Sequence, residues 1–323
     1  MRKGICRDGI SLHRGIMNAL PPGWARRDPA VICLGLTAMD QVWTVEALPD
    51  RAGKTRAADH ASGGGGMAAT AAVAVAHLGG QARFWGRAGK DAAGLAMRRE
   101  LALEGVDVEQ FRLFPGARSS VSCVLVDPAG ERLIVNFRGA DLPNEADWLP
   151  LDQVSGAGAV LADPRWVDGA AAVFAAARKA GVPTVLDADV AEAAVFEKLL
   201  PLTDHAIFSE QALHAFAGSV NALEHVAGFG CAVSAVTRGA DGVNWIEDGA
   251  HHHRAAFPVE VVDTNGAGDV FHGAWAMAIA AGADTGSAAE FASAAAALKC
   301  TRRGGRAGIP DFTETLELWR STR

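Results

Sequence analysis

The sequence predicts an α/β fold in which a doubly wound, mostly parallel sheet carries helices on both faces and a small second sheet stands beside it. After Ala157, short apolar strands alternate regularly with helices, as in a parallel sheet with right-handed crossovers. A hairpin around the turn at 127–130, joined by residues 41–60, would form the small sheet. The strands expected in the main sheet are 31–36, 81–87, 157–162, 184–186, 206–208 and 232–236.

The composition limits the classes of function. Half of the 323 residues are hydrophobic, enough to bury the core of one large domain or two modest ones. A net charge of −7 without a long basic block argues against nucleic acid as a partner. The five cysteines are odd in number and far apart, which indicates neither a zinc site nor a disulfide framework and fits a reducing cytoplasm. No apolar run approaches the roughly 18 residues of a membrane-spanning helix, so no membrane partner is expected.

The first thirty residues are expected to lie outside the folded domain. They carry several arginines but lack the apolar core of a secretory signal, and we expect a disordered or variable extension. The domain is then expected to span 31–323, with a lid formed by about 41–60 and 119–138. Asp40 follows the first strand, at the sheet edge where open α/β proteins bind ligands, although a plain turn explains it equally well.

Two glycine-rich stretches border predicted helices. Four glycines at 63–66 lead into an alanine-rich helix at 67–78, and glycines let a ligand approach the backbone closely. A dinucleotide site is not expected there, because residues 56–62 are no apolar strand. The second stretch, a basic and glycine-rich loop at 300–308, follows a helix at 288–299. It either closes over phosphates or is a helix end with surface arginines.

Residues 263–273 carry the strongest chemical signal. A strand is expected before them at 257–262 and a helix after them at 274–281. A glycine-rich turn at a helix N-terminus favours an anion, and Asp269 adds a carboxylate in the first helical turn. Amides that hold negative charge, beside a carboxylate that accepts a hydroxyl proton, suit phosphoryl transfer. By contrast, three consecutive histidines at 251–253 do not face one point and are expected in a solvated turn.

The glycine-rich stretches and the strands and helices around them occur in an order along the chain that resembles the ribokinase-like, PfkB-type carbohydrate kinases. The glycines at 63–66 resemble the first family signature, 263–273 the second, and 236–242 the nucleotide-site turn. The resemblance covers Val31 to about Asp311. It implies a β-sheet lid on the doubly wound domain, ATP and Mg²⁺, a cytoplasmic enzyme, and a homodimer formed through the lid.

The resemblance also implies roles for single residues on the phosphate side. Asp269 would be the general base, and the backbone of Gly266, Ala267 and Gly268 would form an anion hole. Asp263 and Thr264 fall where many relatives bind a monovalent cation such as K⁺. Glu210 would belong to the water network of magnesium, although Ser209–Ala212 departs from the usual N-x-x-E element and puts that role in doubt. The residues expected to contact the nucleotide are Ser209, Thr237, Gly239, Gly242 and Asn265, the last in place of a more usual threonine.

Within the family, several stretches look most similar to bacterial sulfofructose kinases, which phosphorylate O1 of 6-deoxy-6-sulfofructose in sulfoglycolysis. These stretches are 63–72, 130–136, 161–166, 269–274, 297–301 and 303–310. The similarity implies that Asp40, Gly65 and Gly66 hold sugar hydroxyls, with Thr70 in place of the usual asparagine. It implies that Lys54, Asn136 and Arg165 grip the sulfonate. A kinase for fructose phosphate, fructose or a keto-deoxy sugar acid, and a catalytically silent sensor on the same fold, stay open as alternatives.

Overall fold

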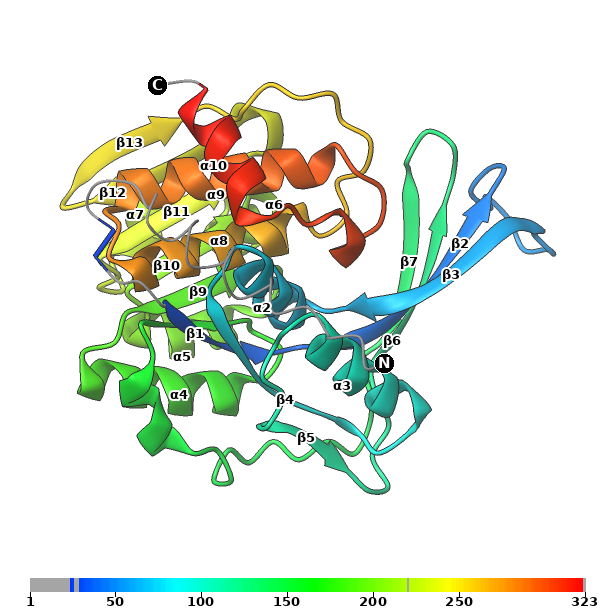
Figure 1. Ribbon diagram of the computed structural model, residues 1–323, viewed down its shortest axis with the longest axis horizontal. Helices are drawn as coiled ribbons and strands as arrows, with labels where there is room; N and C mark the ends of the chain where they lie inside the picture. Colours follow the sequence, from blue (N-terminus) through cyan, green and yellow to red (C-terminus); the bar gives the residue numbers. More distant parts are fainter. Residues whose placement is uncertain (1–23, 26–28, 220, 322–323) are drawn as a thin grey trace, which may run out of the picture.

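The computed structural model describes residues 24–25, 29–219 and 221–321, which form a main α/β body and a small projecting sheet (Figure 1). The predicted fold class is therefore confirmed. Within these residues, no helix is long and apolar enough to cross a membrane.

The main sheet is parallel apart from one edge. Its strands are β1 (Ala30–Gly35), β4 (Gln81–Gly89), β5 (Phe111–Phe114), β8 (Ala159–Ala162), β9 (Thr184–Ala188), β10 (His205–Ser209), β11 (Val233–Thr237), β12 (Val243–Glu247) and β13 (Ala250–Arg254). They run in the order β13-β12-β11-β10-β9-β8-β1-β4-β5, and only β12 and β13 pair in the antiparallel sense. The chain leaves β1 for β4 on one side and later returns to β8 on the other. Ligands of open α/β sheets bind outside the carboxyl ends of the strands at such a reversal.

Helices cover both faces of this sheet (Figure 1). One apolar core contains residues of α2 (Met67–His77), α3 (Ala92–Leu103), α8 (Ala267–Ala281), α9 (Thr285–Cys300) and α10 (Phe312–Arg320). The opposite core contains residues of α4 (Val167–Ala180), α5 (Ala193–Leu199), α6 (Glu210–Ala217) and α7 (Leu223–Ala227). The helices α2 and α8 touch where Gly273 lies against the backbone of Ala71, a contact that leaves no room for a Cβ. This close packing brings the N-termini of the two signature helices toward one site.

The small sheet is the predicted lid. Its strands are β2 (Ala38–Val45), β3 (Ala57–Gly65), β6 (Val121–Val126) and β7 (Arg132–Phe137), in the order β3-β2-β6-β7. The hairpin predicted around 127–130 is therefore present. In the register of the sheet, Asp40 lies between Gly63 and Ser122, and Ser122 lies opposite Asn136.

The strand predicted at 257–262 is wrong. This segment has no regular structure, because Pro258 lacks an N–H group and the next backbone donors bond elsewhere. The N–H groups of Val262 and Asp263 both donate to the carbonyl of Cys300 at the end of α9, at 2.8 and 3.0 Å. The segment instead forms a wall of the cavity described below.

Three smaller features of the fold bear on the predictions. The glycines at 63–65 are the end of strand β3, and β2 supplies their hydrogen-bond partners. The histidines at 251–253 are exposed as expected, but they form strand β13 rather than a turn. Residues 1–23 and 26–28 of the predicted extension lie outside the described residues. Trp24 within it is buried against Phe291, Phe312 and Trp319, so the packed part of the chain includes Trp24.

Candidate active site

The turn at 263–268, called the phosphate turn below, is held in shape by its own backbone. Gly266 is the N-cap of α8 and takes φ +77°, a conformation that L side chains rarely adopt. The carboxylate of Asp263 accepts the N–H groups of Asn265 at 2.8 Å and of Gly304 at 2.9 Å. The N–H of Ala267 donates to the carbonyl of Thr264 at 3.2 Å. Because the first N–H groups of a helix lack intrahelical acceptors, the start of α8 is suited to an anion.

Asp269 lies in the first turn of α8 and is partly shielded from solvent by the surrounding groups. Burial, followed by the charge of Asp187 at the end of β9, raises the pKa of its carboxyl group well above the usual range. A carboxyl group with a raised pKa binds a proton more readily than an exposed aspartate does. Thr70 and Asp269 converge on Gly266, since a Cβ built there would lie 3.6 Å from Thr70 Cγ2 and 3.9 Å from Asp269 Oδ2.

A cavity of about 510 Å³ opens beside the phosphate turn. Three residues predicted to contact a nucleotide, Thr237, Gly239 and Gly242, line it together with Thr264, Ala267 and Gly268 of the turn. The remaining walls are mostly apolar. They come from Ala240, from Phe271 of α8, from 256–261 and from one side of α9, namely Ala256, Phe257, Pro258, Val259, Val261, Ser293, Ala296, Ala297 and Cys300. An apolar cavity that ends at a helix N-terminus offers apolar walls to a planar base and N–H groups to an anion.

On the other side of the phosphate turn, a buried arginine lies beneath the glycine run. Arg306 donates to the carbonyl of Gly65 at 2.7 Å and to Glu100 at 3.2 Å, and its side chain is 4 % exposed. Glu100 in turn accepts the N–H of Gly64 at 2.8 Å. The charge of Arg306 acts on both Asp40 and Asp269. The guanidinium therefore joins the lid strand β3 to the body of the protein and partly neutralises the two carboxylates.

A row of polar side chains crosses the lid above this site. Asp40 is hydrogen-bonded to Ser122, and Asn136 Nδ2 donates to Ser122 Oγ at 3.0 Å and to Ser120 Oγ at 3.3 Å. Burial raises the pKa of the Asp40 carboxyl group, while the bond from Ser122 and the charge of Arg306 oppose that shift. The structure thus brings Asp40 and Asn136 together, as the sequence predicts for a sugar site.

Arg165 lies at the carboxyl end of β8. Its guanidinium donates to Asp189 Oδ2 at 2.6 Å and to the carbonyl of Val190 at 2.7 Å, and its side chain is 15 % exposed. Asp163, two residues earlier, is buried and accepts the backbone N–H groups of Leu36 and Ala68, at 2.7 and 3.2 Å. Asp163 therefore ties together the ends of β1 and β8 and the start of α2, where Gly66 is the N-cap.

The comparisons with known proteins match this geometry. The model of the pfkB family of carbohydrate kinases matches residues 28–311. The chain belongs to this family. It is 28 % identical to the ribokinase of Bacillus subtilis, over 89 % of this chain and 98 % of the relative. It is 30 % identical to the fructokinase of Vibrio alginolyticus, over 79 % of this chain and 91 % of the relative.

Solved structures give the same result. An Agrobacterium tumefaciens protein provisionally described as a ribokinase has 37 % identity and a TM-score of 0.88, over 91 % of this chain and 98 % of that one. The ribokinase of Arabidopsis thaliana, complexed with ribose and ATP, has 27 % identity and a TM-score of 0.78, over 91 % and 99 %. The protein is an ATP-dependent sugar kinase with a ribokinase-like fold.

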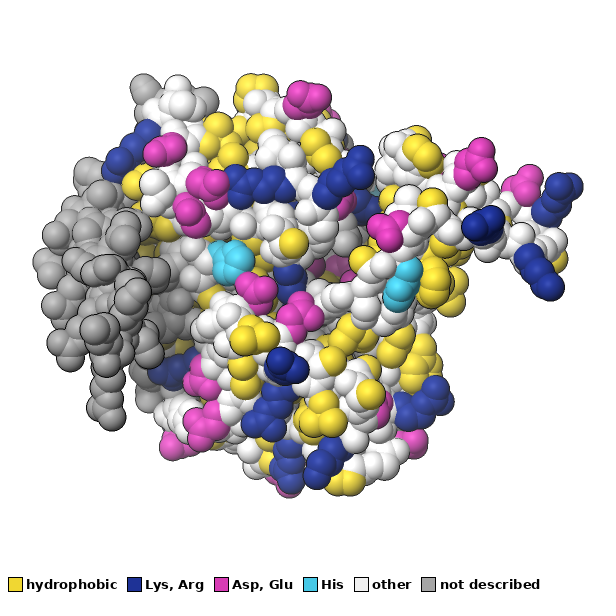
Figure 2. Space-filling model, turned by 45° about the vertical axis from the view of Figure 1, so that its right-hand side comes forward, with side chains coloured by type: hydrophobic (Ala, Val, Ile, Leu, Met, Phe, Trp, Pro, Cys, Tyr) yellow, Lys and Arg dark blue, Asp and Glu magenta, His cyan; other side chains and the backbone are white. Residues whose placement is uncertain are grey.

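Among the residues predicted to contact the substrate, Lys54 lies far from Asp40 and Asn136. It is exposed in the loop between β2 and β3, with Arg51 and Arg56 close by in sequence. Figure 2 shows the lid extending away from the body of the kinase, with Lys and Arg side chains at its far end. The last paired residues before this loop lie about 17 Å along the strand from Asp40, at the rise of an extended chain. Within one chain, Lys54 is therefore distant from Asp40 and Asn136.

The carboxylates at the sheet edge are compatible with magnesium. In the described part of the chain, no group of three or more His, Cys, Asp or Glu side chains is arranged to hold a metal. Kinases hold Mg²⁺ largely through phosphate oxygens and water, with one or two carboxylates. Asp187 Oδ2 is buried and has no hydrogen-bond partner among the described residues, so it fits such a role. Glu210 is paired with Arg238 at 2.9 Å, and Ser209 caps α6 by accepting the N–H of Ala212.

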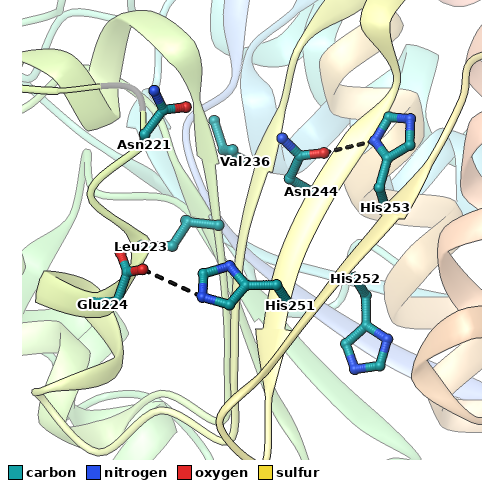
Figure 3. A pocket seen from close by; sticks show the side chains of 8 residues that line it. All are labelled: Asn221, Leu223, Glu224, Val236, Asn244, His251, His252 and His253. Atoms are coloured by element: carbon teal, nitrogen blue, oxygen red, sulfur yellow. Dashed lines mark hydrogen bonds and ion pairs between the residues drawn. The ribbon is translucent and has the colours of Figure 1, made fainter.

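The three histidines line a separate surface pocket. His251 lies 3.3 Å from Glu224, and His253 is hydrogen-bonded to Asn244 at 2.6 Å (Figure 3). His252 stacks on Trp245. His251 and His253 share one face of β13 while His252 lies on the other. The three side chains therefore do not face one point.

Several contributors to the site were missed in the sequence. Arg306 was expected either over phosphates or on the surface, but it is buried on the sugar side, while Arg302 pairs with Glu314 of α10. Glu100 gives no local signal, because its partners are 36 and 206 residues away. The small residues at 293, 296, 297 and 300 of α9 could have indicated this wall of the cavity, since helical positions at this spacing share one face.

Proposed function

We propose that this kinase transfers the γ-phosphoryl group of ATP to O1 of 6-deoxy-6-sulfofructose. The observation that carries the proposal is the position of Arg165. It lies partly buried at the carboxyl end of β8, and its charge acts on Asp163 and Asp187 beside Asp269. A cation there is suited to the anionic end of a sugar whose other end faces the base. The identification of the substrate rests on this feature and on the resemblance to sulfofructose kinases.

The proposed chemistry is an in-line displacement. The C1 hydroxyl oxygen attacks the γ-phosphorus, the bond to the β,γ-bridging oxygen breaks, and ADP leaves. Asp269 takes the hydroxyl proton as the new P–O bond forms. The N–H groups at the start of α8 face the transferring phosphoryl group, where positioning and charge stabilisation supply most of the rate. Mg²⁺, bound to ATP and reached by Asp187, would supply positive charge to the phosphate oxygens.

Gripping a sulfonate requires donors rather than acceptors. A sulfonate is a permanent monoanion with three acceptor oxygens, which suit the planar fork of Arg165 and the amide of Asn136. Arg165 is bonded to Asp189 in the structure, so binding would exchange that carboxylate for the sulfonate. Asp189 is the more exposed partner, with 40 % of its side chain accessible to solvent.

A second candidate substrate is fructose. The ion pair between Arg165 and Asp189 already neutralises the guanidinium, which would suit a sugar with an uncharged C6. The 30 % identity to a fructokinase points in the same direction. The two candidates differ in a single prediction, since only the sulfosugar should depend strongly on the charge of Arg165.

We further propose that two copies associate through the lid. The edge strand β7 exposes a row of apolar side chains, Leu133, Ile134, Val135 and Phe137, at 36, 57, 62 and 37 %. An exposed apolar edge strand is prone to pairing with another chain. Sedimentation of the purified protein tests this association. The cytoplasmic location expected from the sequence remains a separate prediction.

The substrate experiment compares 6-deoxy-6-sulfofructose, fructose 6-phosphate, fructose and a keto-deoxy sugar acid at equal concentration, with ATP consumption as the measurement. The proposal expects the sulfosugar to give the highest kcat/KM. A higher value for fructose or fructose 6-phosphate would reassign the substrate within the family. Failure of every sugar to consume ATP would revive the alternative of a silent sensor.

A further inference from the structure

A fully buried lysine lies directly behind the phosphate turn. Lys299 is the penultimate residue of α9, and its side chain is 0 % exposed. Its ammonium donates to two main-chain carbonyl oxygens, that of Asp263 at 3.0 Å and that of Arg302 at 3.3 Å. Asp263 begins the phosphate turn, and Arg302 begins the loop that follows α9. One cation therefore joins the two segments that border the start of α8.

The surroundings of this nitrogen are those of a monovalent cation site. Proteins hold a dehydrated alkali cation with backbone carbonyl oxygens that replace its water. Here two such oxygens from separate loops converge on one buried positive charge. Burial lowers the pKa of the Lys299 ammonium, and the carboxylate of Asp263 opposes that shift. The end of α9 supplies further negative potential, because the carboxyl end of a helix favours a cation.

The carbonyl of Asp263 also decides whether K⁺ can bind at Asp263 and Thr264, where the family resemblance implies such an ion. The carbonyl of Asp263 already accepts a hydrogen bond from Lys299. The carboxylate of Asp263 is shared by the N–H groups of Asn265 and Gly304 and is also paired with Arg132 of the lid. The oxygens of Asp263 are thus occupied by groups of the chain itself, and a K⁺ ion does not fit there beside the ammonium.

We propose that the ammonium of Lys299 is a built-in monovalent cation, which holds the phosphate turn in its active shape and makes the kinase independent of added K⁺. Lys299 is a positioning residue in this account, since it acts through the backbone of the turn. The inference rests on the assignment of 263–268 to the phosphates of ATP, but it does not depend on which sugar is the substrate.

The first experiment needs no variant. The initial rate of the wild-type kinase is measured, with whichever sugar it turns over, in chloride salts of K⁺, Na⁺ and tetramethylammonium at equal ionic strength. The proposal expects rates that agree within about twofold, because a permanent internal charge replaces the exchangeable ion. Strong activation by K⁺ over tetramethylammonium would overturn it.

The second experiment removes the internal cation. Lys299→Ala should lose about 100-fold in kcat, because a small displacement of the turn misplaces the transferring group. K⁺, NH₄⁺ or methylammonium should restore part of that loss, whereas the larger tetramethylammonium should not. The matched control is Lys198→Ala, which removes an exposed lysine paired with Asp168 and should leave the rate and its cation dependence unchanged. A soluble, folded Lys299→Ala enzyme that no small cation rescues would contradict the proposal.

A binding measurement separates this inference from the proposed function. Small cations should raise the melting temperature of Lys299→Ala but not that of the wild type, because only the variant has a vacant cation site. This readout needs no substrate, so it holds even if every sugar fails. Equal shifts in both proteins, or no shift in the variant, would argue against a cation site.

Discussion

The phosphate side of the proposed site is made from one continuous stretch, residues 263–273, whereas its proposed sugar side draws polar groups from distant parts of the chain. Asp40 comes from β2, Asn136 from β7, Arg165 from the end of β8 and Arg306 from the loop after α9. A continuous turn at a helix start provides the same chemistry for any phosphoryl acceptor. A site assembled from distant segments can change one segment at a time, so the proposal assigns substrate choice to the sugar side.

The largest expected effect lies on the phosphate side. Asp269→Asn should lower kcat by about 10²–10⁴-fold, because the base is lost while the backbone of the turn is kept. Binding of ATP, measured by calorimetry, should stay near the wild-type value. Turnover close to that of the wild type would remove Asp269 from the mechanism, and loss of ATP binding would mean that the variant disturbs the turn.

The next effect lies on the sugar side and is mainly structural. Arg306→Met leaves Glu100, Asp40 and the carbonyl of Gly65 without their buried cation. Breaking such a buried pair costs about 3–5 kcal/mol, which denaturant unfolding would measure. The matched control is Arg303→Met, an exposed arginine three residues away, which should change the free energy of unfolding by less than about 0.5 kcal/mol. Equal destabilisation by both variants would contradict the role given to Arg306.

A smaller effect concerns pH. In the proposed sugar site, an ionised Asp40 would accept stronger hydrogen bonds from sugar hydroxyls than the protonated form would. Burial raises the pKa of its carboxyl group. As pH falls through this raised pKa, Asp40 gains a proton and the KM for the sugar should rise. The rise should begin at a higher pH than an exposed aspartate would give. The KM of Asp40→Asn should be higher and should lack this pH dependence, so a profile that persists in the variant would assign it to another group.

The same contrast explains what the sequence could predict. The phosphate turn, the nucleotide-site turn and the lid hairpin are local patterns, and the structure has each of them. The strand at 257–262 was predicted from apolar and β-branched residues, but hydrogen bonds to Cys300 and the proline decide its conformation. Arg306, Glu100 and Lys299 act through partners that lie far away in sequence or on the backbone. No local pattern reveals such contacts, because burial of a charge depends on the assembled fold.

The central claim is that substrate choice depends on the sugar side and not on the phosphate side, and one ratio of kcat/KM values tests it most directly. The kcat/KM for 6-deoxy-6-sulfofructose is divided by that for fructose, in the wild type and in Arg165→Ala. The account predicts a ratio well above one in the wild type that falls about tenfold or more in the variant, as a lost charge-assisted contact requires. It also predicts an unchanged KM for ATP. A ratio that is the same in both proteins, or a parallel change in the KM for ATP, would contradict it.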